Sequence, residues 1–168
     1  MSKITKIALC AALVLNSVNV APVALASTTT ATIPVSVTVI DSCIVDATPV
    51  AFGNYSGISG GSSSAVATVS PTCTVGTAYT IELCVGLGNS ATYANRKLTG
   101  PSGRVINYNL YSDAARTVVW GDGSAGTGRP SGIGTGTAQP ISLYGSVPAS
   151  QAVAVGSYSD TVTVTLTY

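Results

Sequence analysis

The sequence predicts an all-β domain, a sandwich of short antiparallel strands of the immunoglobulin kind. Its composition is rich in Val, Thr, Ser, Gly and Tyr, which suit a pleated, half-buried surface. Glu and Lys, which are common on the surfaces of helices, are almost absent. Apolar residues alternate with polar ones at a period of two along much of the chain, and Gly-, Ser- and Pro-containing stretches separate these runs.

Residues 1–26 are predicted to be a secretory signal peptide. Lys3 and Lys6 give a positive start, an apolar run over residues 7–15 follows, and a small-x-small motif ends at residue 26. The apolar run is shorter than the ~20 residues that span a bilayer. We therefore expect cleavage before Ser27, export, and no membrane insertion of the mature chain.

The mature chain would hold 142 of the 168 residues, which suits one domain with a core of its own. Loss of the two signal-peptide lysines leaves five basic residues against six acidic ones, a net charge of −1. This weak charge predicts no affinity for nucleic acid or for anionic lipid. Together with a positive mean hydropathy, it fits a surface that like neighbours cover.

Residues 27–40 are predicted to form a separate N-terminal extension, ahead of a domain over residues 41–168. A polar leader is followed by a strand in which Pro34, Ser36 and Thr38 alternate with apolar residues. The apolar face of this strand comprises Ile33, Val35, Val37 and Val39. Pro34 has no N–H to donate, which restricts the strand to an edge or to an unusual pairing.

The middle of the chain is expected to hold short strands separated by turns. Pro71 is expected to break a strand over residues 65–69, and seven glycines over residues 121–137 predict a long loop. The remaining strands are expected at residues 50–52, 79–85, 96–98, 105–111, 117–120 and 138–147.

The last strand has the clearest alternation. Its apolar residues are Val162, Val164, Leu166 and Tyr168, and threonines stand between them. The first and last strands thus each carry an apolar face with no evident partner, and an exposed apolar edge is a liability that proteins manage explicitly. One economical solution is donor-strand complementation, in which the N-terminal strand of one subunit completes the sheet of the next.

Three cysteines remain in the mature chain, namely Cys43, Cys73 and Cys84. An exported protein enters an oxidising compartment, and an odd number allows one internal bridge with one thiol left over. We favour Cys43–Cys73, because each lies at the edge of a strand pattern, while a bridge from Cys84 to either remains open. Cys84 itself is expected to be a buried free thiol.

The sequence does not predict an enzyme or a cofactor site. It contains no histidine, the commonest general base and zinc ligand. Residues 57–61 match G-x-S-x-G, but their serine has no histidine to activate it. Residues 121–126 match G-x-G-x-x-G, but Gly128 and Pro130 prevent the helix that a phosphate cradle needs.

The remaining polar and aromatic residues receive structural interpretations. Arg96 is expected to be a paired charge at the surface or an interface, and Trp120 a core anchor. Three aspartates are expected to bind no metal, and the first and last of them lie next to turn residues, where an aspartate bonds local backbone. They are Asp113, Asp122 and Asp160.

These motifs together give the chain a family resemblance. The residues that carry it are Cys43, Phe52-Gly53-Asn54-Tyr55, Cys73-Thr74, Arg96, residues 108–116, Trp120-Gly121-Asp122-Gly123, Tyr144-Gly145 and residues 156–162. The chain resembles the spore coat U domain proteins, subunits of archaic (Csu-type) chaperone–usher pili. The resemblance implies an incomplete immunoglobulin-like sandwich that lacks its final strand, and a bridge between Cys43 and Cys73. Cys84 departs from the commonest family pattern.

The resemblance also implies a function. We expect a structural subunit of a surface pilus or fimbrium that polymerises by donor-strand exchange and serves attachment and biofilm formation. Its partners would be other pilus subunits, a periplasmic chaperone and an outer-membrane usher. The competing hypothesis is a secreted monomeric binding module or tip adhesin that recognises a glycan or a surface.

Overall fold

The computed structural model describes residues 25–58 and 60–168. The predicted signal peptide, residues 1–26, lies outside the described residues except for its last two, and Ser59 of the G-x-S-x-G motif also lies outside them. The chain divides into two units, one ending at Val37 and one running from Thr38 to Tyr168. Among the described residues, none belongs to a helix with the length and apolar character needed to cross a bilayer.

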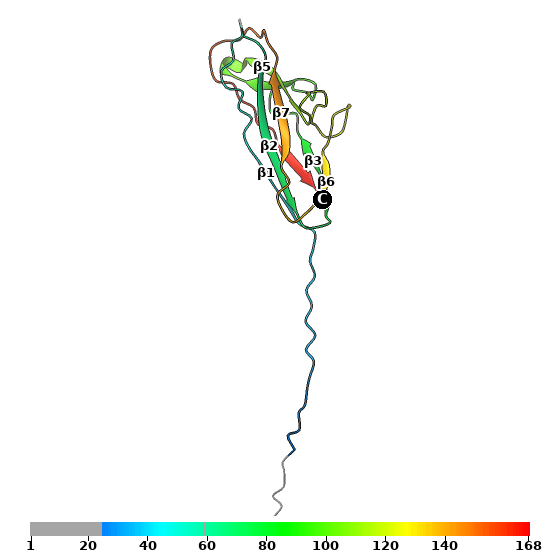
Figure 1. The fold of residues 1–168 in the computed structure, drawn as a ribbon. Coiled ribbons are helices and arrows are strands. Elements are labelled where there is room, and N and C mark those ends of the chain that lie inside the picture. The colour runs from blue at the N-terminus through cyan, green and yellow to red at the C-terminus, as the bar shows by residue number, and fades with distance from the viewer. Residues whose placement is uncertain (1–24, 59) are drawn as a thin grey trace, which may run out of the picture. The chain divides into compact units, whose positions relative to one another are not determined.

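The second unit is a sandwich of two antiparallel sheets, which confirms the predicted all-β class (Figure 1). The larger sheet has the strand order β1-β2-β7-β5-β4 and the smaller one the order β6-β3-β8. The larger sheet comprises β1 (Cys43–Ala47), β2 (Ser63–Cys73), β7 (Ile141–Val147), β5 (Val105–Tyr111) and β4 (Arg96–Thr99). The smaller sheet comprises β6 (Ser131–Ile133), β3 (Ala78–Leu83) and β8 (Val164–Thr167). A short 3-10 helix, η1 (Pro101–Gly103), joins β4 to β5.

The core lies between the two sheets, because alternate residues of each strand point inward. Its buried members come from both layers and include Val69, Ile81, Leu83, Ile106, Leu110, Leu143 and Val147. Trp120 is fully buried among them, and its indole N–H donates to the carbonyl of Ile81 at 3.0 Å. The prediction that Trp120 anchors the core is confirmed.

Arg96 is buried inside the domain, so the expectation of a paired charge at the surface or an interface was wrong. Its exposed fraction is 0%. The guanidinium donates to the carbonyl oxygens of Cys84 (3.0 and 3.2 Å) and Trp120 (2.8 Å) and to the side-chain oxygen of Asn109 (2.9 Å). Burial lowers its pKa from the usual value. The planar fork of five N–H donors lets one residue fasten β4 to the end of β3 and to the loop after β5.

Strand β2 continues through Pro71 to Cys73, although Pro71 was expected to end it. The carbonyl of Pro71 accepts the N–H of Gln139 at 2.9 Å, so this residue directs its backbone groups away from β1. The ladder with β7 has already ended at the Val69–Ile141 pair. The missing N–H therefore removes no bond between β2 and a neighbouring strand.

No strand forms at residues 50–52, where a short one was expected. The N–H of Thr48 still bonds the carbonyl of Thr68 at 2.9 Å, and the chain then leaves the sheet. Phe52 instead lies over Gly145 of β7, where a Cβ atom would come within 2.8 Å of the phenyl ring. Packing of one aromatic ring against a glycine thus replaces pairing in this segment.

Candidate functional site

An open groove runs along one side of the sandwich, next to β8. It consists of two cavities of about 850 and 270 Å³. The two cavities share Val50, Phe52, Leu98 and Asp160 in their linings, so they adjoin one another. We call the pair the edge groove, defined by lining residues 47–58 and 153–164 and by the core residues beneath them.

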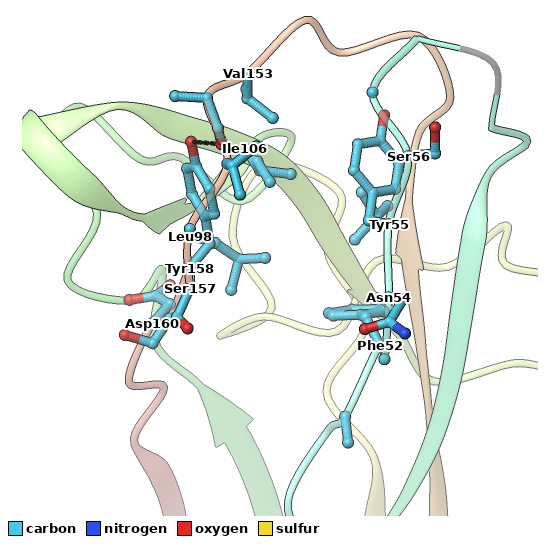
Figure 2. A pocket seen from close by; sticks show the side chains of 18 of the residues that line it. Phe52, Asn54, Tyr55, Ser56, Leu98, Ile106, Val153, Ser157, Tyr158 and Asp160 are labelled. Atoms are coloured by element: carbon cyan, nitrogen blue, oxygen red, sulfur yellow. Dashed lines mark hydrogen bonds between the residues drawn. The ribbon is translucent and has the colours of Figure 1, made fainter.

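The walls of the edge groove come from segments about one hundred residues apart in the sequence. Figure 2 shows Phe52 and Tyr55 on one side of the hollow, facing Leu98, Tyr158 and Asp160 on the other. The floor is apolar and comprises core side chains of both sheets, among them Val69, Leu83, Ile106, Leu110, Leu143 and Val147. A long open cleft with an apolar floor suits an extended apolar segment better than a compact polar ligand.

Hydrogen bonds hold the first wall in place. The hydroxyl of Tyr55 donates to the carbonyl of Pro148 at 2.8 Å and accepts the N–H of Gln151 at 3.0 Å. The side chain of Gln151 in turn bonds both backbone groups of Asn107, on β5. This wall is therefore tied to the larger sheet although it contains no strand.

The opposite wall is fastened at Tyr158 and Ser159. The hydroxyl of Tyr158 donates to the carbonyl of Ala154 at 2.9 Å. Ser159 and Thr99 exchange two backbone hydrogen bonds, of 2.8 and 3.0 Å. The second wall thus continues the edge of β4, and the groove is open in the structure because both of its sides are fixed independently.

Asp160 is the one acidic residue that lines the edge groove, and its carboxylate is fully engaged. It accepts the hydroxyl of Tyr108 at 2.6 Å and the N–H groups of Leu87 at 2.7 Å and Thr161 at 2.8 Å. Burial, followed by this bond to Asp160, raises the pKa of Tyr108 above its usual value. The prediction that Asp160 bonds local backbone holds for Thr161, while its bond to Tyr108 joins the groove to the core.

Strand β8 borders the edge groove with an unpaired edge. Its other edge pairs with β3, and the carbonyl of Thr163 accepts the N–H of Cys84 at 3.0 Å. Successive strand residues direct their N–H and C=O groups to opposite edges, so Val162, Val164 and Leu166 direct theirs away from β3. No strand of the described residues pairs with that side of β8.

The predicted apolar residues of the last strand divide between the groove and the surface. Val162 and Val164 line the edge groove, and Leu166 packs against the core from the same face. Tyr168 is 59% exposed. The backbone groups that are unpaired therefore belong to the same residues whose side chains turn toward the groove.

The predicted N-terminal strand is unpaired. Residues 25–42 are assigned neither helix nor strand. The side chains of Ile33, Val35, Val37 and Val39 are between 79% and 91% exposed. Four aligned apolar side chains in water are unfavourable, since each would gain about 1.5 to 3 kcal/mol from burial.

Comparison with known proteins places this architecture in a family. The family model described as the Spore Coat Protein U domain matches residues 29–165. The chain belongs to the Spore Coat Protein U domain family. That match spans both the exposed N-terminal segment and the edge groove.

Two further likenesses concern individual proteins. The chain is 37% identical over 101 residues to Protein U of Myxococcus xanthus, across 57% of this chain and 55% of that protein. It thus spans about half the length of this relative. Its fold resembles a chain in the crystal structure of the CsuC–CsuE chaperone–tip adhesion subunit pre-assembly complex from archaic chaperone–usher Csu pili of Acinetobacter baumannii. That likeness has a TM-score of 0.58 at 22% identity and covers 78% of this chain and 41% of the other, so it speaks for the fold alone.

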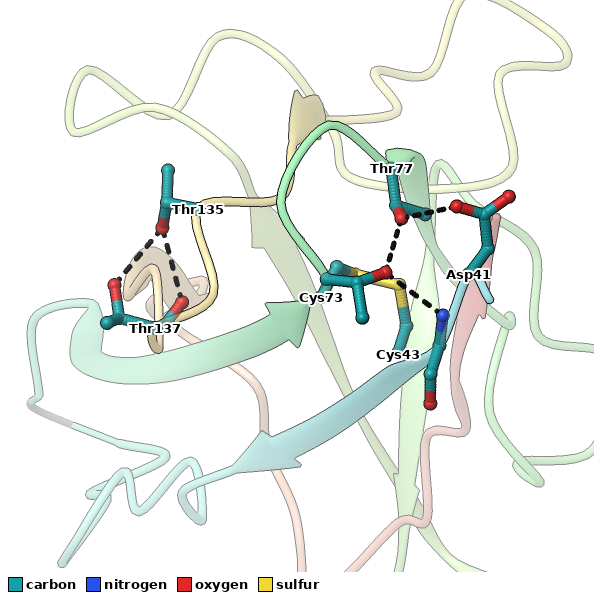
Figure 3. The surroundings of a disulfide bond; sticks show 8 residues. Asp41, Cys43, Cys73, Thr77, Thr135 and Thr137 are labelled. Carbon is teal, nitrogen blue, oxygen red and sulfur yellow. Dashed lines mark hydrogen bonds between the residues drawn. A yellow bond between two sulfur atoms is a disulfide. The ribbon is translucent and has the colours of Figure 1, made fainter. Parts of the chain in front are cut away.

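A disulfide joins Cys43 of β1 to Cys73 of β2, as expected for this Spore Coat Protein U domain (Figure 3). The two residues lie directly opposite each other in the β1–β2 register. Cys84 is free and half-buried, where a buried thiol was expected. Its sulfur accepts the N–H groups of Thr163 at 3.1 Å and Gly86 at 3.4 Å. Because Cys43 and Cys73 are bonded to each other, neither alternative bridge to Cys84 forms.

Sequence reasoning predicted the last strand, β8, and the apolar residues of the N-terminal segment, but missed the groove walls. Phe52, Tyr55, Leu98 and Val153 were not singled out as parts of a site. The one available signal was the only phenylalanine of the chain, close to an aromatic neighbour and followed by glycine. Nothing local indicated that residues 153–158 would face this segment.

Proposed function

We propose that this chain is a structural subunit of a chaperone–usher pilus, polymerised by insertion of residues 27–40 of one copy into the edge groove of the next. The observation that carries the proposal is a match between two unpartnered features. An apolar groove beside the free edge of β8 needs one strand, and the exposed alternating residues Ile33 to Val39 supply one. Membership of the Spore Coat Protein U domain family supports this reading.

The proposal includes partners and a location. The predicted signal peptide would direct the chain to the periplasm, where a chaperone would cover the edge groove until an outer-membrane usher passes the subunit to the fibre. One chain of the chaperone–tip adhesion subunit pre-assembly complex of the Csu pili shares the fold, and this likeness supports a chaperone partner. The fibre would lie on the cell surface and serve attachment and biofilm formation. The subunit carries no catalytic role in this scheme.

The size of the groove agrees with the donor segment. Alternate residues of a strand are roughly 6.6 to 6.8 Å apart. The half-buried residues Tyr158, Val162 and Val164 stand at even positions along one wall, with Asp160 between the first two. Four consecutive inward positions on the wall thus face four inward positions on the donor, from Ile33 to Val39.

The position of Pro34 favours an antiparallel donor. On β8, the residues with inward side chains also direct their N–H and C=O groups to the free edge. In an antiparallel ladder, the two residues that exchange both of their hydrogen bonds lie directly opposite each other and have their side chains on the same face. The bonds would then come from Ile33, Val35 and Val37, and Pro34 would direct its nitrogen away from β8. In a parallel ladder the bonding residues would be the intervening ones, and Pro34 could not donate.

A peptide experiment tests the proposal. The mature chain, residues 27–168, is mixed with a synthetic peptide covering residues 28–40, and its melting temperature is measured. We expect a concentration-dependent rise, because a ligand that binds only the folded state stabilises it. A variant lacking residues 27–39 should bind the peptide but form no fibres. An unchanged melting temperature, or fibres from the truncated variant, would contradict donor-strand exchange and favour a self-contained binding module.

A further inference from the structure

The chain just after the proposed donor strand is tied firmly to the domain. The N–H of Ser42 donates to the hydroxyl of Thr74 at 3.2 Å, and the N–H of Thr74 donates to the carbonyl of Ser42 at 2.9 Å. The hydroxyl of Thr77 donates to the carboxylate of Asp41 at 2.8 Å and lies 2.6 Å from that of Thr74 (Figure 3). We call Asp41, Ser42, Thr74 and Thr77 the root cluster.

The root cluster rests on a fixed support. The disulfide between Cys43 and Cys73 joins strands β1 and β2 directly beside it. The turn that carries Thr77 is bonded to the segment after β6, since Gly76 donates to Gly134 and Gly134 to Thr77, at 3.0 and 2.8 Å. Thr77 is itself buried, so its hydroxyl is shielded from competing water. Residues 41–43 are therefore fixed by several hydrogen bonds and a disulfide, and the residues that make these bonds are themselves bonded to the rest of the domain.

The attachment ends abruptly on the N-terminal side. Val39 and Ile40 are 79% and 75% exposed, and none of the hydrogen bonds found within the described residues involves residues 25–40. An extended chain spans at most about 3.6 Å per residue, so Val39 and Asp41 lie within roughly 7 Å of one another. Val39, the last residue of the donor's apolar face, and Asp41, the first anchored residue, are thus separated by Ile40 alone.

From this arrangement we propose that the root cluster is a positioning device that makes the joint between successive subunits short and rigid. The inference rests on the proposed function, because a joint exists only if Val39 occupies a neighbouring groove. Because no flexible linker lies between the neighbour's groove and the root cluster, the direction in which residues 41–43 leave the domain sets the angle between two subunits. A loose root would allow that angle to vary while leaving the donor strand able to bind.

Two variants and one matched control test the device. Thr74→Val removes the acceptor of the Ser42 N–H while preserving shape, and Asp41→Ala removes the acceptor of the Thr77 hydroxyl. Asp46→Ala is the control, because it removes the same charge from an exposed residue of β1 whose carboxylate makes none of the hydrogen bonds or ion pairs found in the described chain. All three changes leave the apolar donor residues and the groove intact.

The first measurement is amide hydrogen exchange of Ser42 in the mature, unpolymerised chain. Loss of one net hydrogen bond should speed this exchange roughly tenfold in Thr74→Val and by a smaller factor in Asp41→Ala, with no change in Asp46→Ala. Unchanged exchange in Thr74→Val would overturn the root cluster as an anchor, whether or not fibres form.

The second measurement is the spread of angles between adjacent subunits in electron micrographs of fibres. We expect a wider spread for Thr74→Val and Asp41→Ala than for the unaltered chain and Asp46→Ala. Faster exchange with an unchanged spread would overturn the role in the joint. Failure of the unaltered chain to form any fibre would instead refute the proposed function, and the exchange result would still decide whether the anchor exists.

Discussion

Truncation of one donor side chain gives the sharpest test of how residues 27–40 bind. The perturbation is Val37→Ala in a peptide covering residues 28–40, and the matched control is Thr38→Ala in the same peptide. The two residues are neighbours, and both changes produce alanine. They differ in face, because an inward Val37 places Thr38 on the solvent side of the completed sheet.

The magnitude follows from the exposure of Val37 in the single chain. Its side chain is 89% exposed there, so nearly all of its burial would occur on binding. Removing two methyl groups forfeits about 0.8 kcal/mol each, and a cavity left in the groove raises the total to between about 1.6 and 2.5 kcal/mol. Since about 1.4 kcal/mol is a factor of ten, affinity should fall roughly 15- to 60-fold. Thr38→Ala should change affinity by less than about threefold.

Titration calorimetry of the three peptides against the mature chain measures these ratios. Any competition from the chain's own N-terminal segment affects all three peptides equally, so the ratio of dissociation constants is preserved. Equal losses for Val37→Ala and Thr38→Ala would refute the alternating binding mode. A larger loss for Thr38→Ala would show that the opposite face of the strand enters the groove.

Two further predictions concern backbone direction and the buried arginine. N-methylation of Val35 in the same peptide should abolish binding, whereas N-methylation of Ser36 should be tolerated, because an antiparallel donor offers β8 the N–H of Val35. Calorimetry measures both affinities. The reverse order of affinities would indicate a parallel strand. Arg96→Met should lower the free energy of unfolding of the mature chain by about 3 to 5 kcal/mol. The change leaves the carbonyls of Cys84 and Trp120 and the side-chain oxygen of Asn109 buried without their hydrogen-bond donor. Urea unfolding, followed by the fluorescence of Trp120, the only tryptophan, measures this loss of stability. An unfolding midpoint equal to that of the unaltered chain would show that the three acceptors find other partners.

The strands that sequence alone located are those whose alternation is local. The period-two patterns at residues 33–39 and 162–168 depend only on neighbouring residues. The second pattern predicted β8, whereas residues 33–39 form no strand in the single chain. The core position of Trp120 was also accessible, because few environments other than a core or an interface accept an indole ring.

The errors share a physical cause, which is dependence on distant partners. Pro71 was expected to end β2, but its effect depends on which edge its backbone faces and on where the ladder with β7 stops. Arg96 was expected at the surface or an interface, but acceptors from three separate places in the chain create an interior that can hold a cation: the carbonyls of Cys84 and Trp120 and the side chain of Asn109 on β5. Neither the edge that Pro71 faces nor the acceptors around Arg96 can be predicted from the few residues on either side of them.

The sequence by itself determined that the domain is all-β, that histidine-based chemistry is absent, and that residues 33–39 and 162–168 carry alternating apolar side chains. These properties follow from residue types and their spacing, which act over a few ångströms. Only the tertiary structure decided that residues 47–58 and 153–164 stand apart as the walls of an open groove, and which edge of β8 stays unpaired. Those outcomes depend on how two sheets stack and where each ladder ends, and contacts between residues about a hundred positions apart decide both.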